Sequence, residues 1–578
     1  MKKLRLFCIF LIVFISISRD LNANIFEDKN NKFNNSKFFL NYLSGIISFN
    51  KNDIEKSNKY FETIKDLGLY HSEFNYKYVE NLVNKGKIDE AYSFIQNLGQ
   101  DYYHLYPFNL VMFVHDFKNH KYNKIKDYLI VSNKNNLDSL QLELYLDLNL
   151  WSKLATNSSD DNKNFFKDNL GSNSNFKNIF FVQKILINLF LNNEIQINND
   201  FNEISINKNF RRYNFFYLKY FLEKNNKEKI EEVISKNNLN YSDNLLFRQL
   251  FADIKSNDYS IIEKFYNRSD LNDGLAELFY LFGAIYKDQN QIGTSTFYLN
   301  LSDYLNPNFT SNKILGIEDH LLLNDNNKSK IELSKIQDLG SEFYWYANIL
   351  KIKFLSDKLI KNQISVLDNY LKIQDKKNLF LSEKYFELAN ILKNINNYSK
   401  SIDYYKKSIL FENEKYNDWM VYYNMGISYE RSSNWADSEK FFSIALKKSP
   451  KQPEVLNYLA YSWLERNINI DKALSMLTEA VEISKGEGYI VDSLGWAYYL
   501  SKDYLKAEEI LKIAYEKEPS EAVIYDHYGD VLWKNGKEIQ ARNIWQNAVK
   551  LKSIENNLKN SINNKIIFGL DDKSNNKS

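Results

Sequence analysis

Apolar and polar residues alternate along most of this chain with the spacing of amphipathic α-helices. The stretch SEFYWYANILKIKFL, residues 341–355, places apolar side chains three and four positions apart, which is the period of one helix face. Only 17 glycines and 5 prolines occur among 578 residues, so the tight turns of an all-β protein are scarce. The pattern therefore predicts an all-α protein built from many helices.

The helical pattern repeats at a fixed interval near the carboxy terminus. Gly529 follows Gly495 by 34 residues, while Ala460, Gly426 and Ala389 precede Gly495 at successive steps of 35, 34 and 37 residues. A large apolar residue stands one position before each of these reference residues, and small residues recur about 12 and 19 positions after it. Small residues let paired helices approach closely and large ones fill the gaps, so the interval predicts helix–turn–helix units.

The prolines support the same register. Pro307, Pro450 and Pro519 each follow a glycine of the pattern by 24 residues, where a helix pair is expected to end. Degenerate copies of the unit are predicted further upstream. The stretch LSGIISFNKNDIEKSNKYF carries Gly45 and Ser57 at the expected spacing, and YVENLVNKGKIDEAYSFI and residues 275–307 follow the same pattern.

These units resemble the tetratricopeptide repeat (TPR), a helix–turn–helix unit of about 34 residues. The resemblance implies a superhelical solenoid whose concave surface is lined by the first helix of each unit. The wider sequence is similar to long exported TPR proteins of Gram-negative bacteria, most strongly in GYIVDSLGWAYYLSKDYLKAEEIL and YDHYGDVLWKNGKEIQARNIWQNAV. Some members of that family are outer-membrane lipoproteins that act as adaptors of a carboxy-terminal processing protease and deliver cell-wall hydrolases to it.

The amino terminus has the pattern of a secretory signal. Lys2, Lys3 and Arg5 precede an apolar run over residues 6–17, and Ala23 offers a small residue for cleavage. The run is shorter than the roughly 17 to 25 residues of a spanning helix, which favours a cleaved signal over a permanent anchor. The only cysteine, Cys8, lies inside the run without the small preceding residues of a lipoprotein signal, so lipidation is not expected. We therefore expect a periplasmic protein.

The composition shifts divide the chain into six segments. They are a signal peptide (1–23), degenerate TPR-like repeats (24–151), a polar loop (152–175), further degenerate TPR-like helical repeats (176–375), a well-formed TPR array (381–552) and a flexible tail (553–578).

The charge and the candidate chemistry exclude several functions. Residues 1–23 hold four basic residues and one acidic residue, so their removal takes the net charge from +2 to −1, and nucleic-acid binding is not expected. Asp492, Ser493 and Gly495 lack the G-x-S-x-G spacing of a serine hydrolase elbow. His115 and His120 are five residues apart and do not share a helix face, so no metal site is expected. No cofactor is predicted.

The repeat register predicts a peptide-binding groove in the TPR array. Its inward positions lie three residues before, one after and four after each reference residue. Aromatic anchors ringed by hydrogen-bonding groups suit a peptide-binding surface, and the acidic residues favour a basic or neutral segment or an internal loop. An alternative interpretation is that some of the aromatic residues at these positions pack between repeats and do not bind a ligand. The predicted groove residues are Asn457, Tyr461, Leu464, Asp492, Trp496, Tyr499, Asp526, Asp530 and Trp533.

The predicted function is that of a non-enzymatic protein-binding scaffold or adaptor of the bacterial periplasm. The resemblance implies a role in envelope proteolysis or cell-wall turnover, with a protein or peptide as partner and membrane association only through partners or an uncleaved signal. The alternative is a structural or assembly factor of an outer-membrane complex, which predicts apolar patches on the convex face. An enzyme would need a polar cluster within residues 176–370, where the sequence shows none.

Overall fold

The computed structural model describes residues 36–51, 53–69, 71–129, 137–156, 176–206, 208–236, 245–256, 264–322, 326–373, 380–411, 419–552 and 554–570. The predicted signal peptide lies outside these residues, as do residues 157–175 of the predicted polar loop. The first five residues predicted for that loop belong to a helix, because Trp151 and Leu154 bury one of its faces up to Thr156.

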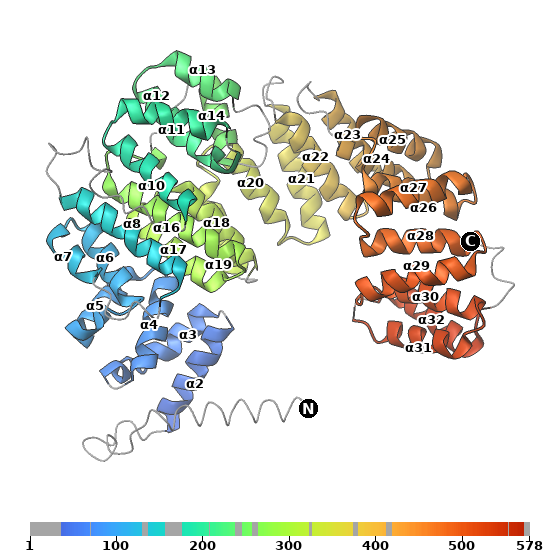
Figure 1. The fold of residues 1–578 in the computed structure, drawn as a ribbon, viewed down its shortest axis with the longest axis horizontal. Helices are drawn as coiled ribbons and strands as arrows, with labels where there is room; N and C mark the ends of the chain where they lie inside the picture. The colour runs from blue at the N-terminus through green and yellow to red at the C-terminus, as the bar shows by residue number, and fades with distance from the viewer. Residues whose placement is uncertain are drawn as a thin grey trace. The chain divides into compact units, whose positions relative to one another are not determined.

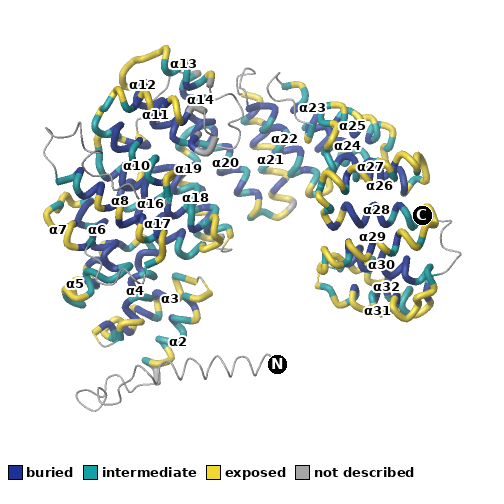
Figure 2. The backbone as a smooth tube through the Cα atoms, viewed as in Figure 1, coloured by how far each residue is buried: buried dark blue, intermediate teal, exposed yellow. Residues whose placement is uncertain are grey.

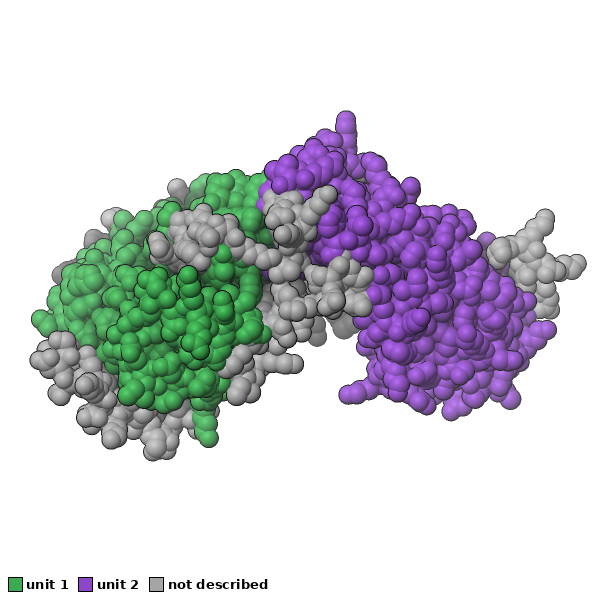
Figure 3. All heavy atoms as spheres, turned by 90° about the horizontal axis from the view of Figure 1, so that it is seen from above, with its two compact units in different colours: residues 1–356 green, residues 357–578 purple. Residues whose placement is uncertain are grey.

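Helices make up most of the described residues, which contain no strand (Figure 1). The predicted all-α fold of helix–turn–helix TPR repeats is confirmed. No helix in the described part of the chain combines the length and the apolar character needed to cross a membrane. The chain divides into two compact units, unit 1 (1–356) and unit 2 (357–578), which are coloured separately in Figure 3.

The helices of unit 1 are, in chain order, α2 (Ser36–Asn50), α3 (Ile54–Glu62), α4 (Ser72–Asn84), α5 (Ile88–Leu98), α6 (Phe108–Lys118), α7 (Tyr122–Tyr128), α8 (Ser139–Thr156), α10 (Lys177–Phe190), α11 (Glu194–Ile206), α12 (Asn214–Glu223), α13 (Lys227–Lys236), α14 (Leu245–Ser256), α16 (Leu271–Asp288), α17 (Ile292–Leu305), α18 (Thr310–Leu322), α19 (Asn326–Ile336) and α20 (Ser341–Ile352), with the short 3₁₀ helices η2 (Lys65–Leu69), η3 (Gln100–Tyr102) and η6 (Lys208–Tyr213).

The helices of unit 2 are α21 (Asp357–Lys372), α22 (Leu381–Asn394), α23 (Tyr398–Leu410), α24 (Trp419–Arg431), α25 (Trp435–Lys448), α26 (Pro453–Glu465), α27 (Ile470–Ile483), α28 (Gly488–Leu500), α29 (Tyr504–Lys517), α30 (Ala522–Lys534), α31 (Glu538–Val549) and α32 (Asn556–Phe568). Consecutive helices from α22 to α31 pack as five pairs. We call the first helix of each pair the A helix and the second the B helix.

The A and B helices of a pair meet where a glycine faces a large side chain. A Cβ atom added to Gly529 would lie 2.2 Å from Nε1 of Trp545, which is sixteen residues later. Gly426 faces Phe442, and Gly495 faces Leu511, in the same way and at the same spacing. Glycine is therefore required at these positions by close approach and not by backbone conformation. In α28 most residues are buried, as Figure 2 shows.

The same contact recurs in unit 1. A Cβ atom on Gly45 of α2 would lie 2.4 Å from the ring of Phe61 in α3, and the Ser57 hydroxyl donates to the Gly45 carbonyl oxygen at 3.0 Å. In unit 2 the Ser438 hydroxyl donates to the Gly426 carbonyl oxygen at 2.9 Å. This hydrogen bond explains why a small residue stands twelve positions after the glycine. The same contact between paired helices thus occurs within each unit.

The A helices end in a turn that needs a left-handed residue. Asn290, Asn396 and Gly536 take this conformation, with φ angles of 61°, 59° and 75°. Asparagine and glycine adopt positive φ at low cost, whereas Ser433 and Lys502 take the same conformation, with φ angles of 60° and 65°, in the turns after α24 and α28.

Unit 1 departs from a simple run of neighbouring repeats. Helix α17 packs against α4 and α6, about 200 residues earlier in the chain. The hydroxyl groups of Tyr106 and Tyr298 lie 2.9 Å apart, and the Lys118 ammonium lies 3.8 Å from the centre of the Tyr304 ring. The amino-terminal helices therefore fold back onto α17, whereas an ideal solenoid contacts only its neighbours.

Two buried ion pairs tie distant helices of unit 1 together. The Arg212 guanidinium binds both carboxylate oxygens of Glu277, at 3.1 and 2.7 Å, and its third donor group binds the Ser311 hydroxyl at 2.7 Å. Arg248 binds Glu342 at 3.2 Å. Residues 176–370 thus contain the polar groups that the sequence pattern did not reveal, because the partners are 65 to 99 residues apart.

The boundary between the units differs from the predicted break at residues 376–380. Helix α21 belongs to unit 2, where its Asp368 binds Lys407 of α23 at 2.8 Å. This pairing attaches α21 to the first repeat of the array.

The glycine contact gives a direct stability prediction. We expect Gly529→Ala to lower the free energy of unfolding by about 1–3 kcal/mol, because the new methyl group would overlap the Trp545 ring. Gly316→Ala in α18 is the control, since a Cβ atom there has no neighbour within 4 Å and alanine favours the helix by up to about 1 kcal/mol. Urea unfolding followed by circular dichroism measures both. A Gly529→Ala variant as stable as the parent would contradict the proposed role of the contact.

Candidate functional site

The nine predicted groove residues lie on three A helices of unit 2. Asn457, Tyr461 and Leu464 belong to α26, while α28 and α30 carry the other six. Within each helix the three residues stand four and then three positions apart, so they share one helix face. We call this surface the A-helix face of unit 2.

Packing accounts for part of this face. Leu464, Asp492, Asp526 and Asp530 are buried, with 4 to 8% of their surface exposed. Asn457, Tyr461, Trp496, Tyr499 and Trp533 are half-buried. The structure thus divides the predicted set into residues that a ligand can reach and residues that bind other parts of the chain.

Asp492 and Trp496 of α28 both bind His527 of α30. The His527 Nδ1 atom lies 3.0 and 3.1 Å from the two carboxylate oxygens of Asp492. The indole of Trp496 stacks on the imidazole with the ring centres 4.0 Å apart, and Tyr499 stacks on the same indole at 4.5 Å. Trp496 therefore has a ring partner from its own repeat and another from the next, and it joins the two repeats.

The charge around His527 favours its protonated form. Burial lowers the pKa of His527, but Asp492, Asp526 and Asp530 act against burial and raise the pKa above its usual value. His527 was not among the predicted site residues, because a lone histidine at this spacing gives no signal in a sequence. Its position two residues before Gly529 is the only feature that could have indicated it.

Asp526 and Asp530 of α30 are occupied by a lysine of the last helix. The Lys565 ammonium lies 2.8 Å from both oxygens of Asp526 and 2.8 and 2.9 Å from those of Asp530. Burial and then Asp526 raise the pKa of Asp530 to about 6, against the opposing effect of Lys565. Both carboxylates are therefore paired with a cation of the chain itself.

The flexible tail predicted from residue 553 is also corrected. Residues Asn556–Phe568 form α32, which packs on α31, while residues 571–578 lie outside the described part of the chain. The Arg542 guanidinium of α31 donates to the Ile566 carbonyl oxygen at 3.1 Å, and Ile562 is buried. The segment was predicted to be flexible because it is rich in asparagine and lysine, and only a few of its residues make these contacts.

Helix α32 also covers Trp533. A Cβ atom on Gly569, directly after the helix, would lie 2.1 Å from the Trp533 indole. The Arg542 guanidinium lies 4.6 Å from the centre of the same indole, and Trp545 packs against it at 5.7 Å. Trp533 therefore packs within the last repeat.

The accessible part of the A-helix face lies on α26 and α28. It comprises Asn457, Tyr461, Trp496 and Tyr499, which are all half-buried. The side-chain oxygen of Asn457 is buried and has no hydrogen-bond partner among the described residues. Glu465, five residues after Ala460, is exposed. Burial of the Tyr461 phenol, and then the charges of Glu465 and Asp492, raise the pKa of Tyr461. Glu465 was not predicted, because it stands one position beyond the inward set.

Asp492 and His527 resemble two members of a hydrolase triad, but the neighbouring serine does not complete it. The Ser493 hydroxyl donates to the Tyr489 carbonyl oxygen at 3.1 Å, within its own helix. A nucleophilic serine needs a hydrogen bond to the histidine, and Trp496 stacks on that imidazole instead. Across the described ranges no three histidine, cysteine, aspartate or glutamate side chains are placed to hold a metal ion.

Comparisons with protein-family models and with curated proteins give no match. Among solved structures, MamA from Desulfovibrio magneticus RS-1 is 19% identical with a TM-score of 0.27, over 31% of this chain and 97% of that one. A thermophilic TPR protein of Thermus thermophilus is 16% identical with a TM-score of 0.29, over 32% and 99% of the two chains. PilF of Pseudomonas aeruginosa is 12% identical with a TM-score of 0.28, over 32% and 92%.

The Lys565 cluster gives the prediction for this site. We expect Lys565→Met to destabilise the last repeat by about 3–5 kcal/mol, because two buried carboxylates lose their partner. If α32 detaches first, the loss equals the free energy that holds α32 on the repeat. Lys559→Met, an exposed lysine on the same helix, is the matched control and should change stability by less than about 0.5 kcal/mol.

Thermal unfolding and amide hydrogen exchange of α32 measure the effect. Restoring part of the loss with Asp530→Asn in the Lys565→Met background would support the charge argument. Equal exchange rates in Lys565→Met and Lys559→Met would show that the cluster does not hold the helix.

Proposed function

We propose that this protein is a non-enzymatic scaffold or adaptor that binds a peptide segment of a partner protein on the A-helix face of unit 2. The observation that carries the proposal is the accessible set on α26 and α28. Tyr461 and Trp496 each stand one position after their reference residues, Tyr499 stands four positions after Gly495, and all three are half-buried beside Asn457. Aromatic side chains next to polar groups bury large area on a ligand at a low entropy cost.

The charge of this face favours a basic or neutral segment. Glu465 is exposed, and no described cation lies within ion-pair distance of its carboxylate. Within the chain, the Lys565 ammonium group lies between two carboxylates of α30, which supports a cationic ligand for the acidic residues of this face. A lysine or arginine of the partner would bind Glu465 in a comparable way, in contrast to TPR proteins that capture a terminal carboxylate with lysine and asparagine.

A second candidate function, a structural or assembly factor of an outer-membrane complex, is favoured by one observation on the B helices. Leu505 of α29 and Ile539 of α31 stand at the same repeat position and are both 79% exposed. Exposed apolar side chains at matched positions of neighbouring repeats suit a permanent interface.

A pair of double variants separates the two functions. We expect Tyr461→Ala with Tyr499→Ala to reduce recovery of the bound partner by about 100-fold or more in affinity, because two aromatic anchors are lost. Leu505→Ala with Ile539→Ala is the matched control and should keep the partner. Affinity purification of the mature protein from crosslinked cells of its own host, followed by quantitative mass spectrometry, measures both variants.

Loss of partners only in the Leu505 and Ile539 variant would favour the assembly factor and overturn binding at the A-helix face. Circular dichroism of each variant shows whether the helices are retained.

We further propose that the protein works in the periplasm, in envelope proteolysis or cell-wall turnover. The proposal rests on the basic start, the short apolar run and the small residue Ala23 of the sequence. The mature protein is expected to begin at Asn24 and to be recovered in the periplasmic fraction. Amino-terminal sequencing after fractionation measures this, and a protein that starts at Met1 in the membrane fraction would contradict cleavage.

A further inference from the structure

Helix α2 of unit 1 exposes apolar side chains along one face. Leu40 and Ile47 are 59% and 54% exposed, and Leu43, which stands between them, is half-buried. Residues three and four positions apart lie on the same side of a helix. Helix α2 packs on α3 and α4 at the edge of unit 1, as Figure 1 shows, and neither covers this face. We call the surface formed by Leu40, Leu43 and Ile47 the α2 outer face.

The repeat register shows that the α2 outer face is distinct from the inward positions. Gly45 is the reference residue of α2, because it faces Phe61 of α3 at the spacing of the other repeats. The outer-face residues stand five and two positions before Gly45 and two positions after it. The inward positions carry other side chains, which pack against the core of unit 1, namely Tyr42, Ile46 and Phe49.

The positions of the α2 outer face are buried between repeats in unit 2. In α28 they carry Ile490, Ser493 and Ala497, and each is at most 6% exposed. Ile490 packs with Leu456 of α26 and Ala480 of α27, which form the preceding helix pair. These positions therefore form the surface on which an A helix meets the pair before it.

The next repeat shows the same arrangement. In α30, Ile524 and Val531 stand five positions before and two after Gly529, and they are 3% and 0% exposed. Ile524 packs with Val491 of α28 and Ala514 of α29, again in the preceding pair. The α2 outer face is thus a repeat-to-repeat surface that no described helix pair covers.

The two terminal helices of the described chain differ in this respect. A terminal repeat that faces water needs a polar outer surface. Helix α32 has one, and Ile567 and Phe568 at its end are its only apolar residues in the exposed class. In α2 the only charged residue is Lys37. The exposed polar residues of α32 are Asn556, Asn557, Lys559, Asn560, Ser561 and Asn564.

This difference favours a second copy of α2 as the occupant of the α2 outer face. A two-fold interface brings the same patch of both copies together, and a patch without charge meets itself without repulsion. The polar surface of α32 does not complement an apolar face, so a head-to-tail filament that joins α2 to α32 is not favoured. A closed pair of two α2 helices continues the packing that joins the repeats within the chain.

The size of the α2 outer face suits a reversible contact. Phe39, beside Leu40, is a further 47% exposed. Burial of these four side chains in both copies removes on the order of 600 Å² of apolar surface from water, below the roughly 1,200 Å² at which stable interfaces begin. An interface of this size is formed and lost with protein concentration.

We propose that the α2 outer face binds the α2 outer face of a second copy, so that the protein forms a reversible homodimer. The contact uses none of the inward positions of the A helices. It is therefore independent of the function proposed for the A-helix face of unit 2.

Sedimentation equilibrium of the mature chain, beginning at Asn24, tests the proposal. We expect a monomer–dimer equilibrium with a dissociation constant of about 1–100 μM. Leu40→Lys combined with Ile47→Lys should weaken dimerisation by about tenfold or more, because like charges then meet across the two-fold axis. Leu505→Lys combined with Ile539→Lys is the matched control, since both side chains are 79% exposed on the B helices of unit 2, and it should dimerise like the parent.

Cysteine crosslinking locates the contact without relying on a disruptive variant. The chain from Asn24 onward contains no cysteine, because the only one is Cys8. Leu43→Cys places a single thiol at the middle of the α2 outer face, where the two copies meet in any two-fold packing. A short bismaleimide should convert this variant to a covalent dimer, and Leu505→Cys, treated in the same way, should stay monomeric.

Four outcomes would overturn the proposal. They are a protein that stays monomeric up to about 100 μM, dimerisation that survives in the Leu40 and Ile47 variant, dimerisation that is lost in the Leu505 and Ile539 variant, and no more crosslinking through position 43 than through position 505. Circular dichroism of each variant confirms that loss of the dimer is not loss of the fold.

Discussion

The contact between a glycine on one helix and a large side chain sixteen residues later determines much of this structure. In Gly426, Gly495 and Gly529 the facing side chain occupies the space that a Cβ atom would need. This contact brings the two helices of a pair together and fixes the rotation of the A helix. Because that rotation is fixed, the positions three residues before, one after and four after the glycine point away from the B helix. These are the positions that the candidate binding site in unit 2 uses.

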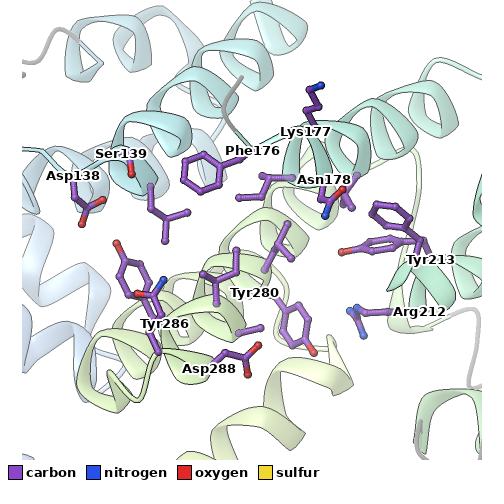
Figure 4. Close-up of a pocket in the computed structure, with 18 residues that line it drawn as sticks. Asp138, Ser139, Phe176, Lys177, Asn178, Arg212, Tyr213, Tyr280, Tyr286 and Asp288 are labelled. Carbon is purple, nitrogen blue, oxygen red and sulfur yellow. The ribbon is translucent and has the colours of Figure 1, made fainter. Parts of the chain in front are cut away.

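The two units use these positions differently. In unit 2, α32 occupies the part of the A-helix face on α30, where Lys565 neutralises two buried carboxylates, and the part on α26 and α28 stays accessible. In unit 1, Tyr280 and Ala284 of α16, at two of the three equivalent positions, line a cavity that α8, α10 and η6 also border (Figure 4). The same repeat thus gives an accessible surface in one unit and a lined cavity in the other.

The sequence alone predicts the features that depend on local spacing. The period around Gly495 predicts the helix pairs, and it places Tyr461, Trp496 and Tyr499 on one face. Features that join distant residues were not predictable in this way. The His527 imidazole pairs with an aspartate 35 residues earlier, and Lys565 reaches 35 and 39 residues back to α30. The packing of α17 on α4 spans about 200 residues and has no periodic signature. In each case one or two side chains form the contact, so neither the composition nor the repeat period of the sequence predicts it.

The central claim is that partners bind the inward positions of the A helices. Crosslinking of the protein with its partners in cells of its own host, followed by residue-level identification of the crosslinks by mass spectrometry, tests this claim most directly. The account predicts that crosslinks to partners gather on α26 and α28 in unit 2. Crosslinks that gather on the B helices α29 and α31, with none on these A helices, would contradict it.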